Sequence, residues 1–437
     1  MRLRSTNNNS PEVSFAEALF QGLAPDGGLY MPIALPNIFD RLEKLDGGND
    51  FPAVAAQIIE GVLGDELGNA LDFTRQTFPF APALVRVSEG IQVLELWHGP
   101  SSAFKDYGAS FLAAAMERLL QDRNQRAIIL TATSGDTGSA VAQAFYGREN
   151  IDVVILFPEG RVSPLQEKQL TTLGGNIHAL QVKGAFDDCQ RMVKEAFMDK
   201  QLCQQVPLTS ANSINIGRLV PQSFYYVYAW AQLRAAGVSE CSFVVPSGNF
   251  GNLTAGVLAW KWGLPVKGFV AATNVNDVVP EYLKTAQYNP RESVATYSNA
   301  MDVGTPSNFD RLQAIFGGSC EEMKNMIAGE VVTDEQTLQT MQRYYQEHKV
   351  FLDPHTAVGV LAAERRRASG DKSEMIVLGT AHPGKFLEVV KEATGVLPDL
   401  PERLAAVLEK KGHADPIFPD VADLRAYLLE KFAGQVI

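Results

Sequence analysis

The chain has 437 residues, of which 46% are apolar, enough to form the cores of two or three domains at roughly 150 residues each. Its 36 Gly and 23 Pro residues exclude a collagen-like or low-complexity chain, and no apolar run reaches the roughly 18 residues of a transmembrane helix. The net charge of −12 argues against general binding to nucleic acid or to an anionic membrane, although a local basic pocket could still hold a small anion.

The first 90 residues are predicted to be mainly helical with loops. Ser14 followed by Glu17 forms a capping box at the start of an apolar helical pattern that begins with Phe15. The sequence Pro25-Asp26-Gly27-Gly28 predicts a turn.

From Gln92 onward, short β-rich runs alternate with amphipathic helical patterns. Two of these helices have strong start signals, Ser163-Pro164 and Asp353-Pro354, in which a capping side chain precedes proline. Several β-rich runs are almost continuously apolar, as expected for strands buried on both faces. The alternation predicts an α/β fold with largely parallel sheets, followed by terminal helices in residues 400–437. The predicted strands are residues 93–96, 127–132, 153–157, 177–182, 242–247, 268–273 and 375–380.

Four of these strands end in small, polar, glycine-rich loops that lead directly into helical patterns. Ligands of α/β proteins bind at the carboxyl ends of strands, so these loops are the candidate functional segments. They are residues 97–106, 133–138, 247–252 and 379–383.

The loop from Ser247 to Asn252 has the composition of an anion-binding turn. Its glycines let successive N–H groups converge, and the helix predicted from Leu253 presents its positive end there. A phosphate group would suit such a loop. Glycine-rich strand-to-helix turns are common in α/β folds, however, so this loop alone favours a purely structural interpretation.

Lys105 stands near the predicted start of a helix with an apolar stripe that includes Phe104 and Phe111. A cation at that position faces the positive end of the helix dipole, which lowers its pKa and favours the neutral amine that a Schiff-base lysine needs. The neighbouring Asp106 would have the opposite effect if its carboxylate points at the amine. From these residues alone, a solvated surface lysine remains the alternative.

The string from Gly379 to Phe386 is similar to the phosphate loop of NTPases. Phe386 stands where Ser or Thr should bind Mg²⁺, and Pro383 lacks an amide that such a loop uses, so NTPase activity is not expected. His98 and His382 could carry protons, although structural hydrogen bonds are the favoured role. No metal site is predicted.

The cysteines are too few for a disulfide scaffold, and none of them forms a Cys-x-x-Cys pair or lies near a histidine at zinc-finger spacing. The polar start of the chain, Met1 to Pro11, lacks the apolar region of a signal peptide. Together these features favour reduced thiols and a cytoplasmic location. The cysteines are Cys189, Cys203, Cys241 and Cys320.

Seven motifs, taken in order along residues 1–395, resemble those of the threonine synthases. The segment from Ser14 to Pro32 is also similar to the N-terminal signature of the bacterial and fungal branch of that family. Any one motif is weak, whereas seven in the family's order are highly specific. The motifs are HGPSSAFKD (98–106), SGDTG (134–138), PLQEK (164–168), NSINIGR (212–218), PSGNFGN (246–252), AATNVND (271–277) and GTAHPGKF (379–386).

Threonine synthases are fold-type II enzymes that use pyridoxal 5'-phosphate (PLP). The resemblance therefore implies two parallel-sheet α/β domains, with the active site in the cleft between them, and a mainly helical N-terminal segment. The expected boundaries are residues 1–90 for that segment, 91–215 for the smaller domain with Lys105, and 216–437 for the larger domain with the phosphate loop and the C-terminal helices.

The resemblance also implies how PLP is held. Lys105 matches the lysine that forms a Schiff base with PLP and moves protons, and Thr380 matches the hydroxyl residue facing the pyridine nitrogen. Asn252 stands where many relatives carry Asp, a change that leaves its main-chain amide unaffected. The cofactor phosphate is expected on the loop of Gly248, Asn249, Phe250, Gly251 and Asn252.

A substrate region is implied in the same way. The loop Ser134 to Thr137, which includes Asp136, matches the loop that receives the substrate carboxylate and the cofactor ring hydroxyl. More distant fold-type II relatives often have Asn in place of Asp136. Segments similar to the substrate-phosphate region contain Lys168, Asn212 and Arg218.

The implied activity is the conversion of O-phospho-L-homoserine and water to L-threonine and phosphate, the last step of threonine biosynthesis, by a carbon–oxygen lyase. The expected partner is this small molecule, without nucleic acid or membrane, and the expected assembly is a monomer or weak homodimer. Another fold-type II lyase, such as a threonine-deaminase or phospho-lyase relative, is one alternative, against which the N-terminal signature argues. A relative that only binds a ligand is the other, and the intact Lys105, phosphate loop and Thr380 argue against it.

Overall fold

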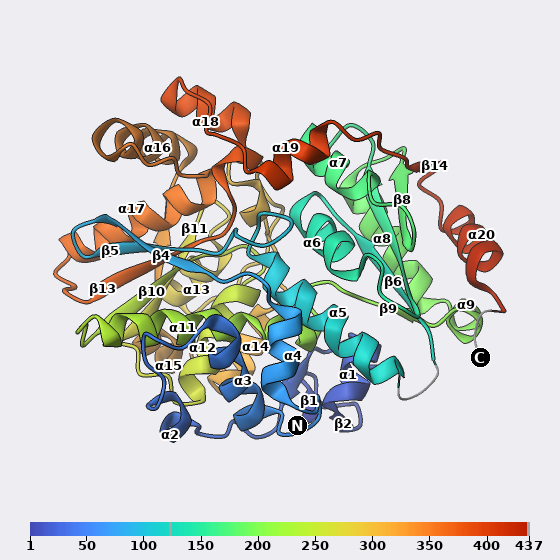
Figure 1. Cartoon of the computed structure of the whole chain (residues 1–437), viewed down its shortest axis with the longest axis horizontal. Coiled ribbons are helices and arrows are strands. Elements are labelled where there is room, and N and C mark those ends of the chain that lie inside the picture. Colours follow the sequence, from blue (N-terminus) through green and yellow to red (C-terminus); the bar gives the residue numbers. More distant parts are fainter. Residues whose placement is uncertain (122–124, 435–437) are drawn as a thin grey trace.

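The computed structural model describes residues 1–121 and 125–434, which are organised around two α/β sheets (Figure 1). Every pairing within these two sheets is parallel except that of the edge strand β4 (Ala83–Ser88) with its neighbour. The six-stranded sheet has the order β12 (Ile327–Val331), β11 (Gly268–Thr273), β10 (Cys241–Pro246), β13 (Glu374–Gly379), β5 (Ile91–Glu95) and β4. The five-stranded sheet has the order β14 (Asp415–Ile417), β8 (Ile177–Val182), β7 (Ile151–Pro158), β6 (Ala127–Ala132) and β9 (Leu208–Thr209).

Both sheets are covered on both faces, as the apolar strands predict. In β10, Phe243 and Val245 join one core while Val244, between them, joins another, because successive side chains of a strand point to opposite faces. One face of the six-stranded sheet is covered by α11 (Gln222–Ala235) and α12 (Gly251–Lys261). Its other face is covered by α16 (Asp334–His348), α17 (Pro354–Ala368) and α18 (Leu387–Thr394). The five-stranded sheet is sandwiched by α6 (Asp136–Phe145), α8 (Phe186–Met198) and α20 (Val421–Phe432).

The N-terminal segment is mainly helical, as predicted, and also contains a small antiparallel sheet of order β2-β1-β3 that the sequence did not indicate. The predicted capping box is present, with the Ser14 side chain accepting from the Glu17 N–H and the Glu17 carboxylate accepting in return. The elements are β1 (Arg2–Ser5), β2 (Val13–Ser14), α1 (Phe15–Gln21), β3 (Tyr30–Pro32), α2 (Phe39–Leu42), α3 (Phe51–Val62) and α4 (Ala70–Thr77).

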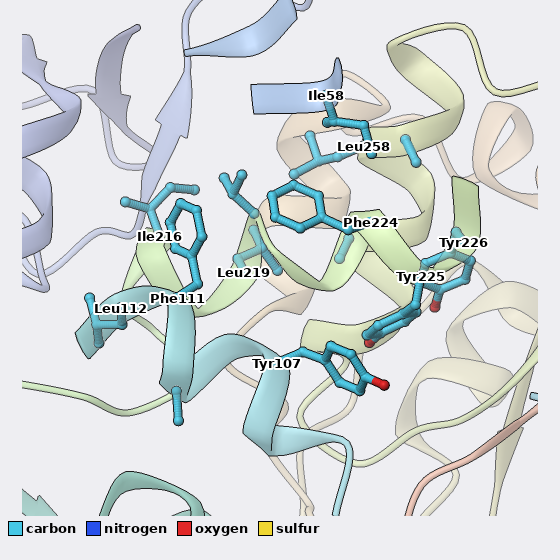
Figure 2. Close-up of a cluster of buried hydrophobic side chains, with 14 of the residues drawn as sticks. Ile58, Tyr107, Phe111, Leu112, Ile216, Leu219, Phe224, Tyr225, Tyr226 and Leu258 are labelled. Carbon is cyan, nitrogen blue, oxygen red and sulfur yellow. The ribbon is translucent and has the colours of Figure 1, made fainter. Parts of the chain in front are cut away.

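The helix α5 (Lys105–Gln121) is fixed in the core that the two sheets share (Figure 2). The ring of Tyr107 meets that of Tyr225 edge to face with centroids 5.4 Å apart, and Phe111 meets Phe224 in the same way at 5.9 Å. Aromatic pairs of this geometry add to the stability that burial provides. The first turn of α5, which begins with Lys105, is therefore held against α11.

The sheets cut across the predicted boundaries at residues 90 and 215. Strand β5 lies between β13 and β4 in the six-stranded sheet, where four of its five residues are buried. At the other end of the chain, β14 pairs with β8 and so returns to the five-stranded sheet. The sequence alone indicated neither the place of β5 in the six-stranded sheet nor the return of β14 to the five-stranded sheet.

The remaining helices connect these layers, and none of the helices in the described ranges is long and apolar enough to cross a membrane. They are α7 (Pro164–Thr171), α9 (Lys200–Gln205), α10 (Ile216–Leu219), α13 (Val278–Thr285), η1 (Asn299–Met301), α14 (Phe309–Ile315), α15 (Cys320–Met326), η2 (Pro383–Lys385) and α19 (Glu402–Leu408).

Candidate active site

The loops that follow β5 and β13 are joined directly in front of Lys105. The N–H of Phe104 donates to the carbonyl of Thr380 at 2.8 Å, and the N–H of His382 donates to the carbonyl of Ser102 at 3.1 Å. Ser102 adopts a left-handed conformation with φ of 58°. The two loops are thus fixed to each other by main-chain bonds, which sets the position at which α5 and Lys105 begin.

Lys105 has the environment of a lysine that loses its proton easily. Desolvation lowers the pKa of its ammonium, and the nearby cations Arg218 and Lys385 lower it further, while the carboxylate of Asp136 acts in the opposite direction. The acid that faces Lys105 is therefore Asp136, at the start of α6, rather than its sequence neighbour Asp106.

Asp106 is turned away to support the preceding loop. Its Oδ2 atom accepts from the N–H of Ser101 at 3.0 Å, and its side chain is buried. Burial raises the pKa of Asp106 to about 6, against the stabilising hydrogen bonds from Ser101 and the charge of Lys385. Asp106 therefore does not raise the pKa of Lys105, although its position next to Lys105 in the sequence suggested that it could.

Asp136 forms a buried ion pair with Lys385, a residue that the sequence did not single out. The Lys385 Nζ atom lies 2.7 Å from Asp136 Oδ1, and the Gln166 side chain donates to the same oxygen at 3.1 Å. Burial opposes ionisation of Asp136, but the ammonium groups of Lys385 and Lys105 outweigh it and hold the pKa of the carboxyl below its usual value. Asp136 is therefore an anion shared by two lysines.

The flanking residues of the same loop are more open. Ser134 is exposed and Thr137 half-buried, whereas Asp136 between them is buried. Gly135 has φ of 147°, and a Cβ atom there would lie 2.4 Å from the Gln166 side chain, so only glycine allows Gln166 to reach Asp136.

The loop between β10 and α12 carries a row of free donors. In the described part of the chain, the main-chain N–H groups from Gly248 to Asn252 donate to no protein acceptor, and Phe250 adopts a left-handed conformation with φ of 59°. The side-chain amide nitrogen of Asn308 is buried without a partner and lies 3.4 Å from where a Cβ of Gly251 would stand. Convergent donors at a helix N-terminus suit a phosphate group.

The side chain of Asn252 points away from this row. Its Oδ1 atom accepts from the hydroxyls of Tyr225 at 2.6 Å and Tyr226 at 2.8 Å, in the buried core. The side chain of Asn252 therefore contacts the tyrosine core, whereas its main-chain amide belongs to the row of free donors.

Gly248 cannot be enlarged without moving the segment that covers it. A Cβ atom would lie 2.6 Å from the carbonyl oxygen of Ala300 and 2.8 Å from the Cα of Met301. Ala300 is itself held, because its N–H donates to Nε2 of His355 at 3.1 Å, which leaves the proton on Nδ1 for Asp353 at 2.9 Å. The histidine is thus a structural support, consistent with its place in the first turn of α17.

We therefore expect Gly248→Ala to weaken PLP binding, because overpacking at this backbone contact costs about 1–3 kcal/mol. Fluorescence titration of the apoprotein with PLP measures the effect as a decrease in affinity. Wild-type PLP affinity in Gly248→Ala would contradict this account of the loop.

A fully buried arginine that the sequence analysis missed ties the loop after β10 to the candidate substrate segment. Arg311 donates to the Asn308 side chain at 2.7 Å and to the carbonyls of Ile214 at 2.6 Å and Tyr30 at 3.1 Å. In turn, the N–H of Asn308 donates to the carbonyl of Asn249 at 3.2 Å. Burial lowers the pKa of Arg311 to about 9, with Asp310 opposing. The guanidinium thus links three segments distant in sequence.

Of the three residues predicted for the substrate phosphate, Arg218 is the one whose charge acts on Lys105. It is buried, donates to the Ala211 carbonyl, and keeps its Nε atom without a partner. Burial lowers the pKa of Arg218 to about 10, while Asp106 raises it. A buried cation with a free donor is ready to pair with an anion.

The other two residues occupy different positions. Asn212 accepts from the hydroxyl of Thr131, at the end of β6, at 2.6 Å and is half-buried. The ammonium of Lys168, on the last turn of α7, donates to the main-chain carbonyl of Lys410 in an exposed position. The structure does not bring Lys168 to the group of charges around Lys105.

The two candidate loop histidines have structural partners. Nδ1 of His382 accepts from the N–H of Gly384 at 3.0 Å, and burial together with the charge of Arg403 lowers the pKa of His382 to about 4. The Nε2 atom of His98 lies 2.8 Å from Glu95. These contacts agree with the favoured structural role.

Thr380 is buried at the end of β13, and its carbonyl accepts from Phe104, next to Lys105. We expect Thr380→Ala to weaken PLP binding by about 0.5–1.5 kcal/mol, or about 1–3 kcal/mol if the ring nitrogen is left buried and unpaired. Titration of the apoprotein with PLP, alongside thermal unfolding, measures this. An unchanged PLP affinity would mean that the Thr380 hydroxyl does not contact PLP.

Comparison with known families defines the class of protein first. Residues 85–380, which contain Lys105, the free-donor loop and Thr380, match the model of a pyridoxal-phosphate dependent enzyme. The chain is a PLP-dependent enzyme, and the free donors and buried lysine fit that cofactor. Two further models match toward the ends of the chain, the threonine synthase N terminus over residues 2–71 and the threonine synthase C-terminal part over residues 356–428. The chain belongs to the threonine synthase family of PLP-dependent lyases.

The similarity to individual relatives extends over nearly the whole chain. The threonine synthase of Escherichia coli (strain K12) is 44% identical over 411 residues, which cover 93% of this chain and 94% of that protein. The PLP-bound threonine synthase of Brucella melitensis has a crystal structure that matches with a TM-score of 0.92 at 36% identity, covering 99% of each chain. The crystal structure of the E. coli threonine synthase matches with a TM-score of 0.89 at 42% identity, covering 98% of this chain and 100% of that one.

Proposed function

We propose that this enzyme converts O-phospho-L-homoserine and water to L-threonine and phosphate, as a carbon–oxygen lyase. The observation that carries the proposal is the position of Lys105, beside the shared anion Asp136 and the buried cation Arg218. A site with a poised amine and a buried cation suits an amino-acid substrate that carries a phosphate. Membership of the threonine synthase family supports the same reaction.

In this proposal Lys105 carries PLP, the main-chain amides from Gly248 to Asn252 hold its phosphate, and the Thr380 hydroxyl faces its ring nitrogen. When bound, PLP supplies an electron sink for negative charge that develops on the substrate carbons. The Asn308 side-chain amide, buried and without a partner, adds a further donor beside Gly251.

Lys105 is the proton carrier of the proposed reaction. As a neutral amine it accepts the proton of the substrate α-carbon, and it returns protons when the product forms. The net change breaks the Cγ–O bond and one Cβ–H bond, releases phosphate, and adds water with its hydroxyl on Cβ and its proton on Cγ. Desolvation of Lys105 favours this role because it lowers the pKa of the ammonium.

The anionic groups of the substrate need local partners, because a protein of net charge −12 repels a phosphorylated amino acid at long range. Arg218 is the proposed partner of the substrate phosphate, with Asn212 as a neutral donor. The loop of Ser134, Asp136 and Thr137 is proposed to receive the substrate carboxylate, with the exposed Ser134 hydroxyl and the half-buried Thr137 hydroxyl as donors.

We further propose that the enzyme acts in the cytoplasm as a monomer or weak homodimer, without nucleic-acid or membrane partners. The cysteines Cys189, Cys203, Cys241 and Cys320 are free thiols, which suits a reducing compartment.

Product analysis with the purified holoenzyme tests the reaction. With O-phospho-L-homoserine we expect threonine and phosphate in equal amounts. Ammonia and 2-oxobutanoate as the main products would instead indicate a deaminating lyase. Binding of the substrate without turnover would indicate a binding protein with an enzyme fold.

A further inference from the structure

The second lysine of the site, Lys385, has no role in the proposed reaction, yet its side chain is completely buried. It lies in η2, at the end of the loop that follows β13. A fully buried lysine is rare unless its ammonium is paired, because removing the charge from water is costly. The position therefore requires a reason beyond packing.

The ammonium of Lys385 joins loops from three strands of the two sheets. It donates to Asp136 Oδ1 at 2.7 Å, in the loop after β6, and to the carbonyl of Ser101 at 2.8 Å, in the loop after β5. The same Ser101 carbonyl accepts from Gln169 at 3.1 Å. Lys385 thus holds the Asp136 carboxylate in a fixed direction beside Lys105.

The charged groups that surround Lys105 come from several elements. Asp136 of α6 favours its protonated form, whereas Arg218 of α10 and Lys385 of η2 oppose that form. Asp106, in the first turn of α5, faces Arg218 and Lys385 and is bound to Ser101. Without Lys385, the charge of Asp136 would fall mainly on Lys105.

We propose that Lys385 is a positioning residue that takes up the Asp136 carboxylate and so keeps Lys105 free of its proton. A carboxylate that is already paired with one ammonium attracts a second ammonium less strongly. The consequence for catalysis rests on the proposed role of Lys105, but the effect on Lys105 does not.

Removing the ammonium of Lys385 acts on Lys105 in one direction only. A neighbouring cation disappears, and Asp136 is left to pair with Lys105 alone, so both changes favour the protonated amine. We expect Lys385→Met to raise the proton affinity of Lys105 on the order of tenfold or more, a shift of about one pKa unit upward. Asp136→Asn removes the anion and is expected to shift the pKa of Lys105 downward.

The measurement is competitive labelling of the full-length apoprotein with isotopic acetic anhydride between about pH 6 and pH 11, followed by mass spectrometry of the peptide that contains Lys105. The variants are Lys385→Met, Lys385→Arg, Asp136→Asn and the double variant Lys385→Met with Asp136→Asn. Lys391→Met is the matched control, because it makes the same substitution at an exposed position on α18. Thermal unfolding monitors the fold of each variant.

Lys385→Met should raise the pKa of Lys105, Lys385→Arg should leave it near that of the wild type, and the double variant should restore it, because one charge of each sign is then removed. An unchanged pKa of Lys105 in Lys385→Met, or a double variant that behaves like Lys385→Met, would overturn the proposal. If Lys385→Met does not fold, Lys385→Gln takes its place, with the same expected rise in the pKa of Lys105; an unchanged pKa in that variant would overturn the proposal equally. Labelling needs neither PLP nor substrate, so its failure is separate from a failure to form threonine.

Discussion

Replacement of Lys105 with Ala is expected to abolish both turnover and the visible absorption band of bound PLP. The same amine is proposed to tether PLP and to carry protons, so its loss removes both functions at once. Loss of a general acid–base group alone costs about 10²- to 10⁴-fold in rate, and loss of the tether adds to that. Steady-state kinetics and an absorption spectrum of the variant measure the two effects.

Lys105→Arg is the companion variant, because it keeps a long basic side chain next to Asp136 but cannot form the Schiff base. Both variants should lack the absorption band of a PLP Schiff base and be inactive, while borohydride treatment of the wild type should fix PLP on the peptide that contains Lys105. If Lys105→Ala retains even a tenth of the wild-type kcat, the assignment of this lysine is wrong.

The second large effect is expected at Arg218. Its guanidinium is buried and its Nε atom has no partner, so truncation would remove the cation that we propose for the substrate phosphate. We expect Arg218→Met to lose roughly 2–5 kcal/mol, or about 30- to several-thousand-fold in kcat/KM, with O-phosphohomoserine. Deamination of serine or threonine as a side reaction should change little, because those substrates lack the phosphate.

Steady-state kinetics of Arg218→Met with both kinds of substrate tests this prediction. Lys168→Ala is the comparison, since the sequence predicted the same role for Lys168 but the structure sets its ammonium on the carbonyl of Lys410. Equal losses of Arg218→Met on phosphorylated and unphosphorylated substrates would mean that Arg218 supports the fold or the cofactor. A large loss in Lys168→Ala alone would move the phosphate position to α7.

The central strands of the fold were predictable because their burial leaves a continuous apolar run in the sequence. Strands β6, β8 and β11 begin and end at the predicted residues. The missed strands have weaker signals, since β4 is half-exposed at the edge of its sheet and β12 contains Gly329 and Glu330. Their pairing depends on neighbours that are distant in the sequence.

The site residues divide in the same way, into those that lie in sequence motifs and those whose role depends on partners distant in the sequence. Lys105, Asp136 and the loop after β10 lie in motifs that can be read along the chain. Lys385 lay in the motif GTAHPGKF and in a string similar to an NTPase phosphate loop, but neither assigned it a role. Its partner Asp136 is about 250 residues away, so that role follows only from folding. Arg311 was missed for the same reason, because its acceptors are carbonyls, which leave no trace in residue identity.

The most direct test of the proposed reaction is the fate of solvent oxygen when the holoenzyme acts on O-phospho-L-homoserine in water enriched in ¹⁸O. Cleavage of the Cγ–O bond and addition of water at Cβ predict threonine labelled in its hydroxyl group and phosphate without label, as mass spectrometry of both products would show. Label in the phosphate, with homoserine as the organic product, would mean cleavage of the P–O bond and would contradict a lyase that works through Lys105.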